Sequence, residues 1–335
     1  MKKLIIPLLI LALLMVATSI VKRRGQGERT AAPAAATSSH TDELYVEVSA
    51  LGGIDYFYDH KLGMKLAGEA LGVRTEYVGP AEYDMQAMVT AFEQTLVKKG
   101  LKGVVVVGFE PVLEPIINKA VGMGIPVVTV DADLPNSKRV AFVGTGNYQA
   151  GVEGGRKMAE LIGQKGKVAL MTKVGQSNLE ERIRGYKDAL ARFPGIEIVQ
   201  IVDTQSDPVI AAQVATAVLS KTTDLAAIGC VEAAGGNGAA VAVQEAKLTG
   251  KVKIVAMDRG NDVLELIAKG VISASVAQQT ALMPFYATQI LFNLQHQKIP
   301  ITSDNIKAGV SGAPAVVDTG VVIVDESNYT YFLRK

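Results

Sequence analysis

The chain has 335 residues, a length that suits two domains of ordinary size better than one. About half of it (49%) is apolar, and 34 basic residues balance 33 acidic ones. This balance argues against a nucleic-acid-binding protein, which usually carries a basic surplus. The single cysteine, Cys230, excludes an intrachain disulfide, and three widely separated histidines offer little for a histidine-built metal site. We therefore expect no metal.

The N-terminal residues have the pattern of an export segment. Leu4–Val21 contain no charged residue and are flanked by basic residues at both ends. The run is longer than the apolar region of a cleaved signal peptide and long enough to span a membrane, so an uncleaved anchor fits it better. We predict a signal or anchor segment over 1–24 and a flexible linker over 25–43. The rest of the chain is expected in the periplasm or on the outer face of the cell membrane.

From residue 44 the chain alternates β-branched runs with amphipathic stretches. The first half predicts strands over 44–51, 73–78, 103–107 and 126–130, and helices over 57–71, 85–99 and 112–123. Val104–Val107 and Val127–Val130 are continuous apolar runs, which are typical of strands buried on both faces of a parallel sheet.

The same alternation restarts after Asn147. The second half predicts strands over 168–171, 196–202, 226–229, 252–257 and 272–276, and helices over 151–162, 179–193, 208–219, 235–247, 262–269 and 280–293. This order predicts two successive parallel sheets, each covered by its own helices. Asp84 and Asp207 directly precede helices and are expected to be N-caps.

Acidic and aromatic side chains follow the predicted strands, where open parallel sheets bind their ligands. These candidate site residues are Asp55, Tyr56, Phe57, Phe109, Asp131, Asp133, Glu232, Asp258 and Gln278. Carboxylates accept hydrogen bonds from sugar hydroxyls, and rings cover the apolar faces of a sugar. Any one acidic residue after a strand is equally well explained as a helix N-cap, so the prediction depends on their convergence.

Catalytic motifs are absent or weak. The sequence has no P-loop and no Gly-x-Ser-x-Gly segment. Ala233–Ala240 lacks the three-glycine spacing of a dinucleotide loop, and we interpret it as a tightly packed strand-to-helix turn. Cys230 is interpreted as a buried, inert thiol and the histidines as surface residues. We therefore expect a protein that is not an enzyme, with an oxidoreductase using the 235–238 loop as an alternative.

The pattern of strand-end residues over 44–335 resembles the periplasmic sugar-binding proteins of ABC importers, in the ribose-binding-like group of the type I two-lobed fold. The motifs that carry the resemblance are Gly124–Asp133, Asn147–Gly151, Arg182–Tyr186, Ile254–Asp258 and Ala277–Gln279. It implies an α/β fold of two similar doubly wound parallel-sheet lobes joined by a three-crossing hinge. The N-terminal lobe is expected over 44–145 plus 279–311, and the C-terminal lobe over 146–278 plus 312–335. The crossings are expected near 144–147, 278–280 and 309–312.

The resemblance also implies roles for individual residues. Tyr56 and Phe57 match the family's aromatic stackers, Asp131 and Asp258 its ligand-binding carboxylates, and Gln278 its hinge-proximal amide. Several positions differ from the ribose binder: among them, Ala132 and Glu180 stand where arginines are expected, and Gly108 and Glu232 where asparagines are expected. A ligand other than ribose is therefore predicted.

The function implied by the resemblance is capture of a monosaccharide or polyol and its delivery to the permease subunits of an ABC transporter. The protein is expected to be a monomer, to hold no cofactor and to bind no nucleic acid. A membrane-anchored sugar sensor that signals to a kinase or chemoreceptor is the alternative.

Overall fold

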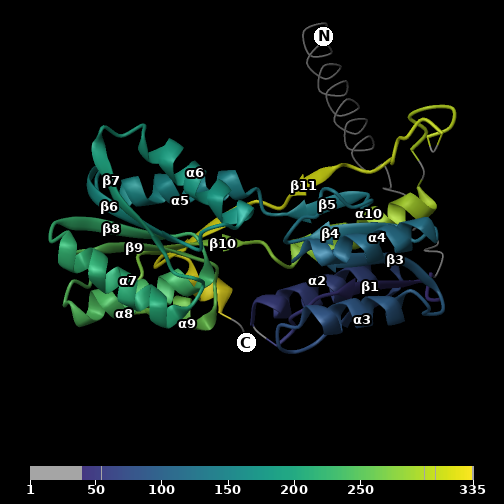
Figure 1. Cartoon of the computed structure of the whole chain (residues 1–335), viewed down its shortest axis with the longest axis horizontal. Coiled ribbons are helices and arrows are strands. Elements are labelled where there is room, and N and C mark those ends of the chain that lie inside the picture. The colour runs from purple at the N-terminus through teal and green to yellow at the C-terminus, as the bar shows by residue number, and fades with distance from the viewer. Residues whose placement is uncertain (1–39, 54, 298, 306, 334–335) are drawn as a thin grey trace, which may run out of the picture. The chain divides into compact units, whose positions relative to one another are not determined.

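A computed structural model describes residues 40–53, 55–297, 299–305 and 307–333, with only the backbone at Asp55. Two six-stranded sheets run through this part of the chain (Figure 1), in the orders β11-β5-β4-β3-β1-β2 and β12-β10-β9-β8-β6-β7. The strands pair in parallel, except that β12 is antiparallel to β10. The predicted fold of two similar parallel-sheet halves is confirmed.

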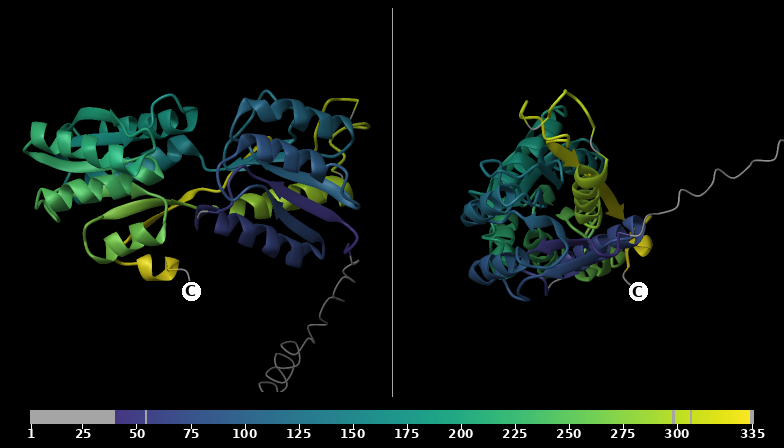
Figure 2. Two further views of the ribbon diagram at one scale, coloured as in Figure 1. Left: turned by 60° about the horizontal axis from the view of Figure 1, so that its bottom comes forward. Right: turned by 90° about the vertical axis from the view of Figure 1, so that its right-hand side faces the viewer.

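The first sheet takes its strands from the first half of the chain and one strand from the tail. They are β1 (Leu44–Val48), β2 (Arg74–Val78), β3 (Leu101–Val107), β4 (Val127–Val130), β5 (Ala141–Gly144) and β11 (Val316–Asp318). Its helices are α2 (Asp55–Leu71), α3 (Met85–Thr95), η1 (Pro111–Leu113), α4 (Glu114–Gly122) and α10 (Leu282–His296). Figure 2 shows α10 back beside the first sheet, although the strand before it belongs to the second.

The second sheet is built in the same way. Its strands are β6 (Lys165–Thr172), β7 (Gly195–Asp203), β8 (Leu225–Cys230), β9 (Lys253–Met257), β10 (Ala274–Gln278) and β12 (Val321–Asp325). Its helices are α5 (Asn147–Leu161), α6 (Ser177–Leu190), α7 (Pro208–Lys221), α8 (Ala233–Glu245), α9 (Asn261–Ala268) and η2 (Tyr329–Phe332).

Alternate residues of the central strands face opposite hydrophobic cores. In β3, Val104 and Val106 pack with residues of α3 and α4, whereas Val105 and Val107 pack with residues of α2 and α10. All four are fully buried. Burial on both faces explains why this run is continuously apolar, because each successive side chain enters a different core.

The chain passes between the sheets three times. It leaves the first sheet after β5, returns after β10, and crosses again between β11 and β12. The third crossing therefore lies between Asp318 and Val321, further along than the predicted 309–312, because the short strand β11 pairs with β5 in the first sheet. The rest of the predicted domain division stays a prediction.

Three local predictions are confirmed and one is wrong. The carboxylates of Asp84 and Asp207 cap α3 and α7, accepting hydrogen bonds from backbone N–H groups of the first turn. Cys230 is fully buried. His60, in contrast, is not a surface residue: it is fully buried, with its Nδ1 2.6 Å from Glu47 Oε1, because it faces the core side of α2.

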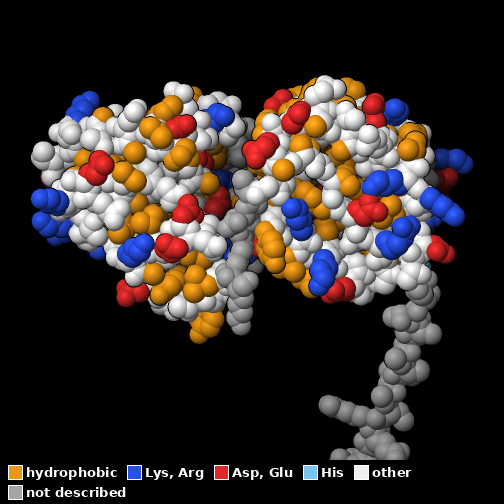
Figure 3. Space-filling model, turned by 90° about the horizontal axis from the view of Figure 1, so that it is seen from below, with side chains coloured by type: hydrophobic (Ala, Val, Ile, Leu, Met, Phe, Trp, Pro, Cys, Tyr) orange, Lys and Arg blue, Asp and Glu red, His pale blue; other side chains and the backbone are white. Residues whose placement is uncertain are grey.

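Residues 1–24 lie outside the described residues, as does most of the predicted linker. Its last residues are held in place: the Glu43 N–H donates to the His40 carbonyl at 2.8 Å, and Arg74 donates to the Thr41 carbonyl. No helix in the described ranges is both long and apolar enough to cross a membrane. On the face drawn in Figure 3, basic and acidic side chains are interspersed, in line with the near-neutral charge of the sequence.

Candidate functional site

Two aspartates occupy equivalent places at the carboxyl ends of the two sheets. Asp131 directly follows β4, and Asp258 directly follows β9. Both have a left-handed backbone, with φ of 65° and 68°, and each donates its N–H to a carbonyl of the next strand, Val143 or Val276. Such a φ is unfavourable for a residue with a Cβ, although Asp and Asn tolerate it best. The strain turns both carboxylates beyond their strands, and residues held in this way are often part of a functional site.

A cavity of about 330 Å³ brings both aspartates together. Its lining combines residues from the first sheet with a larger group from the second. They are Tyr56, Asp131, Gln176, Asn178, Leu179, Arg182, Ser206, Glu232, Ala233, Ala234, Asp258 and Gln278. Its volume lies at the lower end of the range for small-molecule sites, about 300–1,000 Å³.

Arg182 is the central cation of this pocket. Its guanidinium donates to the side-chain oxygen of Asn147 at 2.8 Å, to the Val231 carbonyl at 2.9 Å and to Gln278 Oε1 at 3.1 Å. The Gln278 amide in turn donates to Asp258 Oδ1 at 2.9 Å. Because Arg182 is only 6% exposed, this chain of hydrogen bonds fixes its guanidinium in the pocket wall.

The carboxyl group of Asp258 is harder to ionise here than in a solvent-exposed aspartic acid. Burial raises its pKa above the usual value, whereas Arg182 and Gln278 act in the opposite direction. A ligand that donates hydrogen bonds to this carboxylate would stabilise its charged form.

Tyr56 joins the first sheet to the same pocket. Its hydroxyl donates to Asp131 Oδ1 at 2.7 Å, and burial, together with the charges of Asp131 and Asp258, raises its pKa well above the usual value. The hydroxyl therefore stays protonated at neutral pH and orients the Asp131 carboxylate.

Glu232 has a structural role as well as a place in the pocket. One of its carboxylate oxygens accepts from Thr204 Oγ1 and the other from the Ala234 N–H, each at 2.8 Å. The residue is thus the N-cap of α8, which was the alternative explanation for an acidic residue after a strand.

The structure places five predicted site residues in the pocket: Tyr56, Asp131, Glu232, Asp258 and Gln278. Four others, Phe57, Phe109, Asp133 and Glu180, are not among the residues that line it. Phe57 is 2% exposed and packs in the core against Phe109, with ring centroids 6.1 Å apart. Asp133 accepts hydrogen bonds from the Thr129 hydroxyl, from the Leu134 N–H, and from Nε and Nη2 of Arg139. Glu180 is exposed on α6, and the side chain of Asp55 lies outside the described residues.

Some residues that line the pocket do not follow a strand and were not predicted from the sequence. They come mainly from α6 and the loop before it. Arg182 is the most important, and its position carries a recognisable signal. Leu179, Ile183 and Tyr186 form the buried face of α6, and Arg182 lies on that same face. A charged residue on the apolar face of an amphipathic helix needs buried partners, and this favours a site residue.

A second hollow, over α2 and β2, has a different character. Its volume is about 460 Å³, and it is lined by Lys61, Met64, Lys65, Gly68, Glu69, Val73, Thr75, Glu76 and Tyr77. Its charged groups lie on the exposed face of α2 and on the edge strand β2, and Lys98 already pairs with Glu76. Unlike this hollow, the pocket at the strand ends combines a buried arginine with carboxylates from both sheets.

Comparisons with known proteins agree with this architecture. Residues 48–298 match the family described as "Periplasmic binding protein domain". A D-allose-binding periplasmic protein of Escherichia coli is 30% identical over 237 residues, which cover 68% of this chain and 76% of that protein.

Solved structures are similar over most of the chain. The arabinose-binding protein AraP of Geobacillus stearothermophilus is 37% identical, with a TM-score of 0.82, and the match covers 88% of this chain and all of AraP. A sugar-binding protein of a sugar ABC transporter from Bacillus halodurans gives the same identity and TM-score over 87% of this chain and 100% of its own. The chain belongs to the periplasmic binding protein family and has its type I two-sheet fold.

Proposed function

We propose that this protein captures a monosaccharide or polyol in the pocket between the strand ends of its two sheets and delivers it to the permease of an ABC transporter. The observation that carries the proposal is the convergence of Tyr56, Asp131, Arg182, Asp258 and Gln278 on one cavity. Because these residues come from both sheets, a ligand in the cavity contacts both halves of the fold. Binding thereby favours the arrangement in which the two halves approach each other.

The polar groups of the pocket suit a neutral polyol better than an anion. Among the lining residues that the structure describes, Asp131, Glu232 and Asp258 are acidic and Arg182 is the single cation. Carboxylates accept hydrogen bonds from hydroxyl groups, and the guanidinium donates to hydroxyl or ring oxygens. An anionic ligand would instead be repelled by three carboxylates.

The two features that a catalytic role would use, the thiol of Cys230 and the glycines of the 235–238 loop, both have structural explanations. Cys230, the single cysteine, is fully buried, and burial raises the pKa of its thiol well above the usual value. Gly235, Gly236 and Gly238 are buried in the first turns of α8, where a Cβ at Gly238 would lie 2.4 Å from the Ala211 side chain. Close helix packing accounts for these glycines, and this weakens the oxidoreductase alternative.

The relatives support a sugar as the ligand class and a place outside the cytoplasm. Of the similar proteins described above, one binds D-allose, one binds arabinose, and one belongs to a sugar ABC transporter. Pentoses, hexoses and their reduced polyols are therefore the first compounds to test.

A thermal-shift screen of the purified protein against pentoses, hexoses, polyols and sugar acids tests the proposal. We expect one or a few neutral sugars or polyols to raise the melting temperature, because a ligand that binds only the folded state stabilises it. Mass spectrometry of the best ligand after incubation should show no conversion. A preference for sugar acids, or conversion of the ligand, would contradict the proposal.

Delivery to a permease is tested in the source organism. Deletion of the coding sequence should abolish uptake of the radiolabelled ligand found in the screen, and the wild-type chain should restore it. Unchanged uptake combined with loss of a transcriptional response to that sugar would favour the sensor instead.

A further inference from the structure

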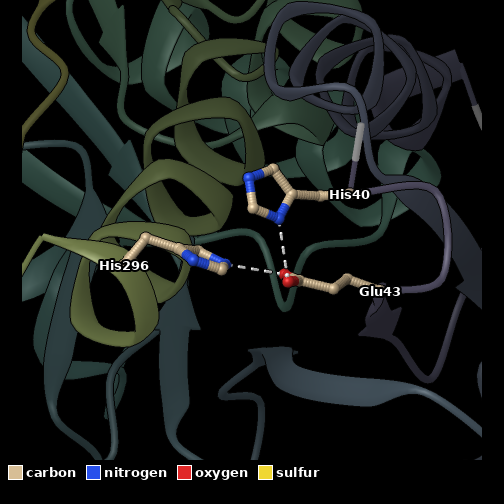
Figure 4. A group of neighbouring side chains, drawn as sticks. All are labelled: His40, Glu43 and His296. Carbon is tan, nitrogen blue, oxygen red and sulfur yellow. Dashed lines mark hydrogen bonds and ion pairs between the residues drawn. The ribbon is translucent and has the colours of Figure 1, made fainter. Parts of the chain in front are cut away.

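A second cluster of polar side chains lies away from the sugar pocket, at the amino-terminal edge of the first sheet. His40 and Glu43 precede β1 in one tight turn, and His296 is the last residue of α10 (Figure 4). Residues far apart in the sequence therefore converge on one carboxylate. His40 Nδ1 lies 3.0 Å from Glu43 Oε1, and His296 Nε2 lies 2.9 Å from Glu43 Oε2.

We propose that His40, Glu43 and His296 form a binding site for a divalent transition metal ion, with Zn²⁺ as the best-matched ion. One ligand atom from each side chain can be chosen so that all three lie within 4.8 Å of one another. Bond lengths of about 2.0–2.2 Å in a tetrahedral zinc site place neighbouring ligand atoms roughly 3.3 Å apart. The two contacts between a histidine nitrogen and a Glu43 oxygen, at 3.0 and 2.9 Å, lie close to this value, so small side-chain movements would bring the three ligand atoms around one ion.

The chemistry of the donors selects the kind of metal. Two imidazoles and one carboxylate suit Zn²⁺ and similar borderline ions, whereas Mg²⁺ and Ca²⁺ prefer sites built from oxygen atoms alone. Three protein ligands leave one tetrahedral position for water. The cluster is also accessible to solvent, with side-chain exposures of 20% for His40, 13% for Glu43 and 28% for His296.

Neighbouring side chains hold the three ligands in place. The Tyr45 hydroxyl donates to Glu43 Oε2 at 3.2 Å, and such outer contacts orient metal-binding carboxylates. The Phe292 ring packs against both imidazoles, with centroid distances of 5.1 Å to His40 and 4.3 Å to His296. A metal bound here would tie the start of β1 to the end of α10.

Zinc titration of the full chain, purified without a polyhistidine tag and stripped of metal with a chelator, tests the site. We expect one equivalent of Zn²⁺ to bind and to raise the melting temperature, because the ion binds only the folded arrangement. His296→Ala and Glu43→Gln should each weaken the affinity for Zn²⁺ by more than about 10-fold, the lower range for loss of even an outer-shell partner. Gln295→Ala, on the same turn of α10, should bind Zn²⁺ as the wild type does.

The three histidines of the sequence provide a readout that needs no variant. In the ¹⁵N-histidine spectrum of the wild type, Zn²⁺ should shift the imidazole signals of His40 and His296 and leave those of buried His60 unchanged. Co²⁺ should give the visible absorption of a four-coordinate site. Unchanged signals of His40 and His296 at about 100 μM Zn²⁺, or equal affinity in the folded variants, would show that the cluster is only a hydrogen-bonded junction.

Discussion

Asp258 illustrates how a binding residue is held at the expense of stability. Its backbone has a φ of 68°, and burial raises the pKa of its carboxyl. The left-handed backbone makes folding less favourable, and burial makes it less favourable still when the carboxyl group is charged. A strained backbone, and a carboxyl group that is costly to ionise without the ligand, are both expected in a binding pocket.

We predict that Asp258→Asn weakens sugar binding about 10- to 100-fold while raising the melting temperature of the ligand-free protein at pH 7. Asparagine accepts the left-handed backbone and the hydrogen bond from Gln278, but it loses the charge. A hydrogen bond to a charged group contributes about 1.5–3 kcal/mol, against about 0.5–1.5 kcal/mol for a neutral one, so the loss is about 1 kcal/mol for each sugar hydroxyl. Calorimetric titration and thermal melts measure the two effects. Asp84→Asn, at an exposed N-cap where both residues cap equally well, is the matched control.

The stabilisation by Asp258→Asn should depend on pH. The pKa of Asp258 in the folded protein lies above its reference value of 3.8, so the unfolded chain ionises more readily and ionisation favours unfolding. This penalty is fully present above the folded pKa and disappears as the pH falls to about 3.8. The difference in melting temperature between variant and wild type should therefore shrink in acid, and a difference that grows in acid would contradict the account.

Strand-end reasoning predicted Asp131, Asp258 and Gln278 because parallel strands bring their carboxyl ends to one edge of a sheet. The same reasoning could not distinguish Asp133 from these site residues, because only the fold shows that the Asp133 carboxylate forms an ion pair with Arg139. Glu180 and Arg182 are two residues apart on α6, which is enough to move a side chain from the exposed to the buried face.

At the scale of elements, two glycines determine how closely α5 and α6 pack. A Cβ at Gly151 would lie 2.0 Å from the Arg182 carbonyl oxygen, and a Cβ at Gly185 would lie 2.1 Å from the Tyr148 carbonyl oxygen. The obstacles are backbone atoms, so no side-chain rotation relieves them. The helix that carries Arg182 thus depends on a close backbone approach.

Gly151→Ala should therefore destabilise the protein by about 1–3 kcal/mol and also weaken sugar binding, because separating the helices displaces Arg182. Gly122→Ala is the control: a Cβ there meets nothing within 4 Å at the end of α4, and alanine should stabilise the helix by up to about 1 kcal/mol. Denaturant unfolding and calorimetry give both quantities. Equal stability of the two variants would show that α5 and α6 can separate freely.

Element types were predictable wherever burial imposes a clear pattern, as in the valine runs of β3 and β4, which are buried on both faces of the sheet. The short strands β5, β11 and β12 had no such signal. β11 contains three residues, and its partner β5 lies far away in the sequence, so its place depends on tertiary pairing. This is why the third crossing was predicted too early.

At the scale of the whole molecule, we predict that the N-terminal segment anchors the protein in the membrane. We expect Leu4–Val21 to hold the full chain at the membrane, because the run has no charged residue and is long enough to span. Fractionation followed by N-terminal sequencing should find the intact chain in the membrane fraction. A soluble exported product that begins near Thr37 would show that the segment is cleaved.

A crystal structure with the best ligand of the thermal-shift screen tests most directly whether one sugar binds between the two sheets. We predict sugar hydroxyls within hydrogen-bond distance of Asp131, Arg182 and Asp258, with Tyr56 beside the ring. A ligand seated in the hollow over α2 and β2, or contacting only one of the two sheets, would contradict it.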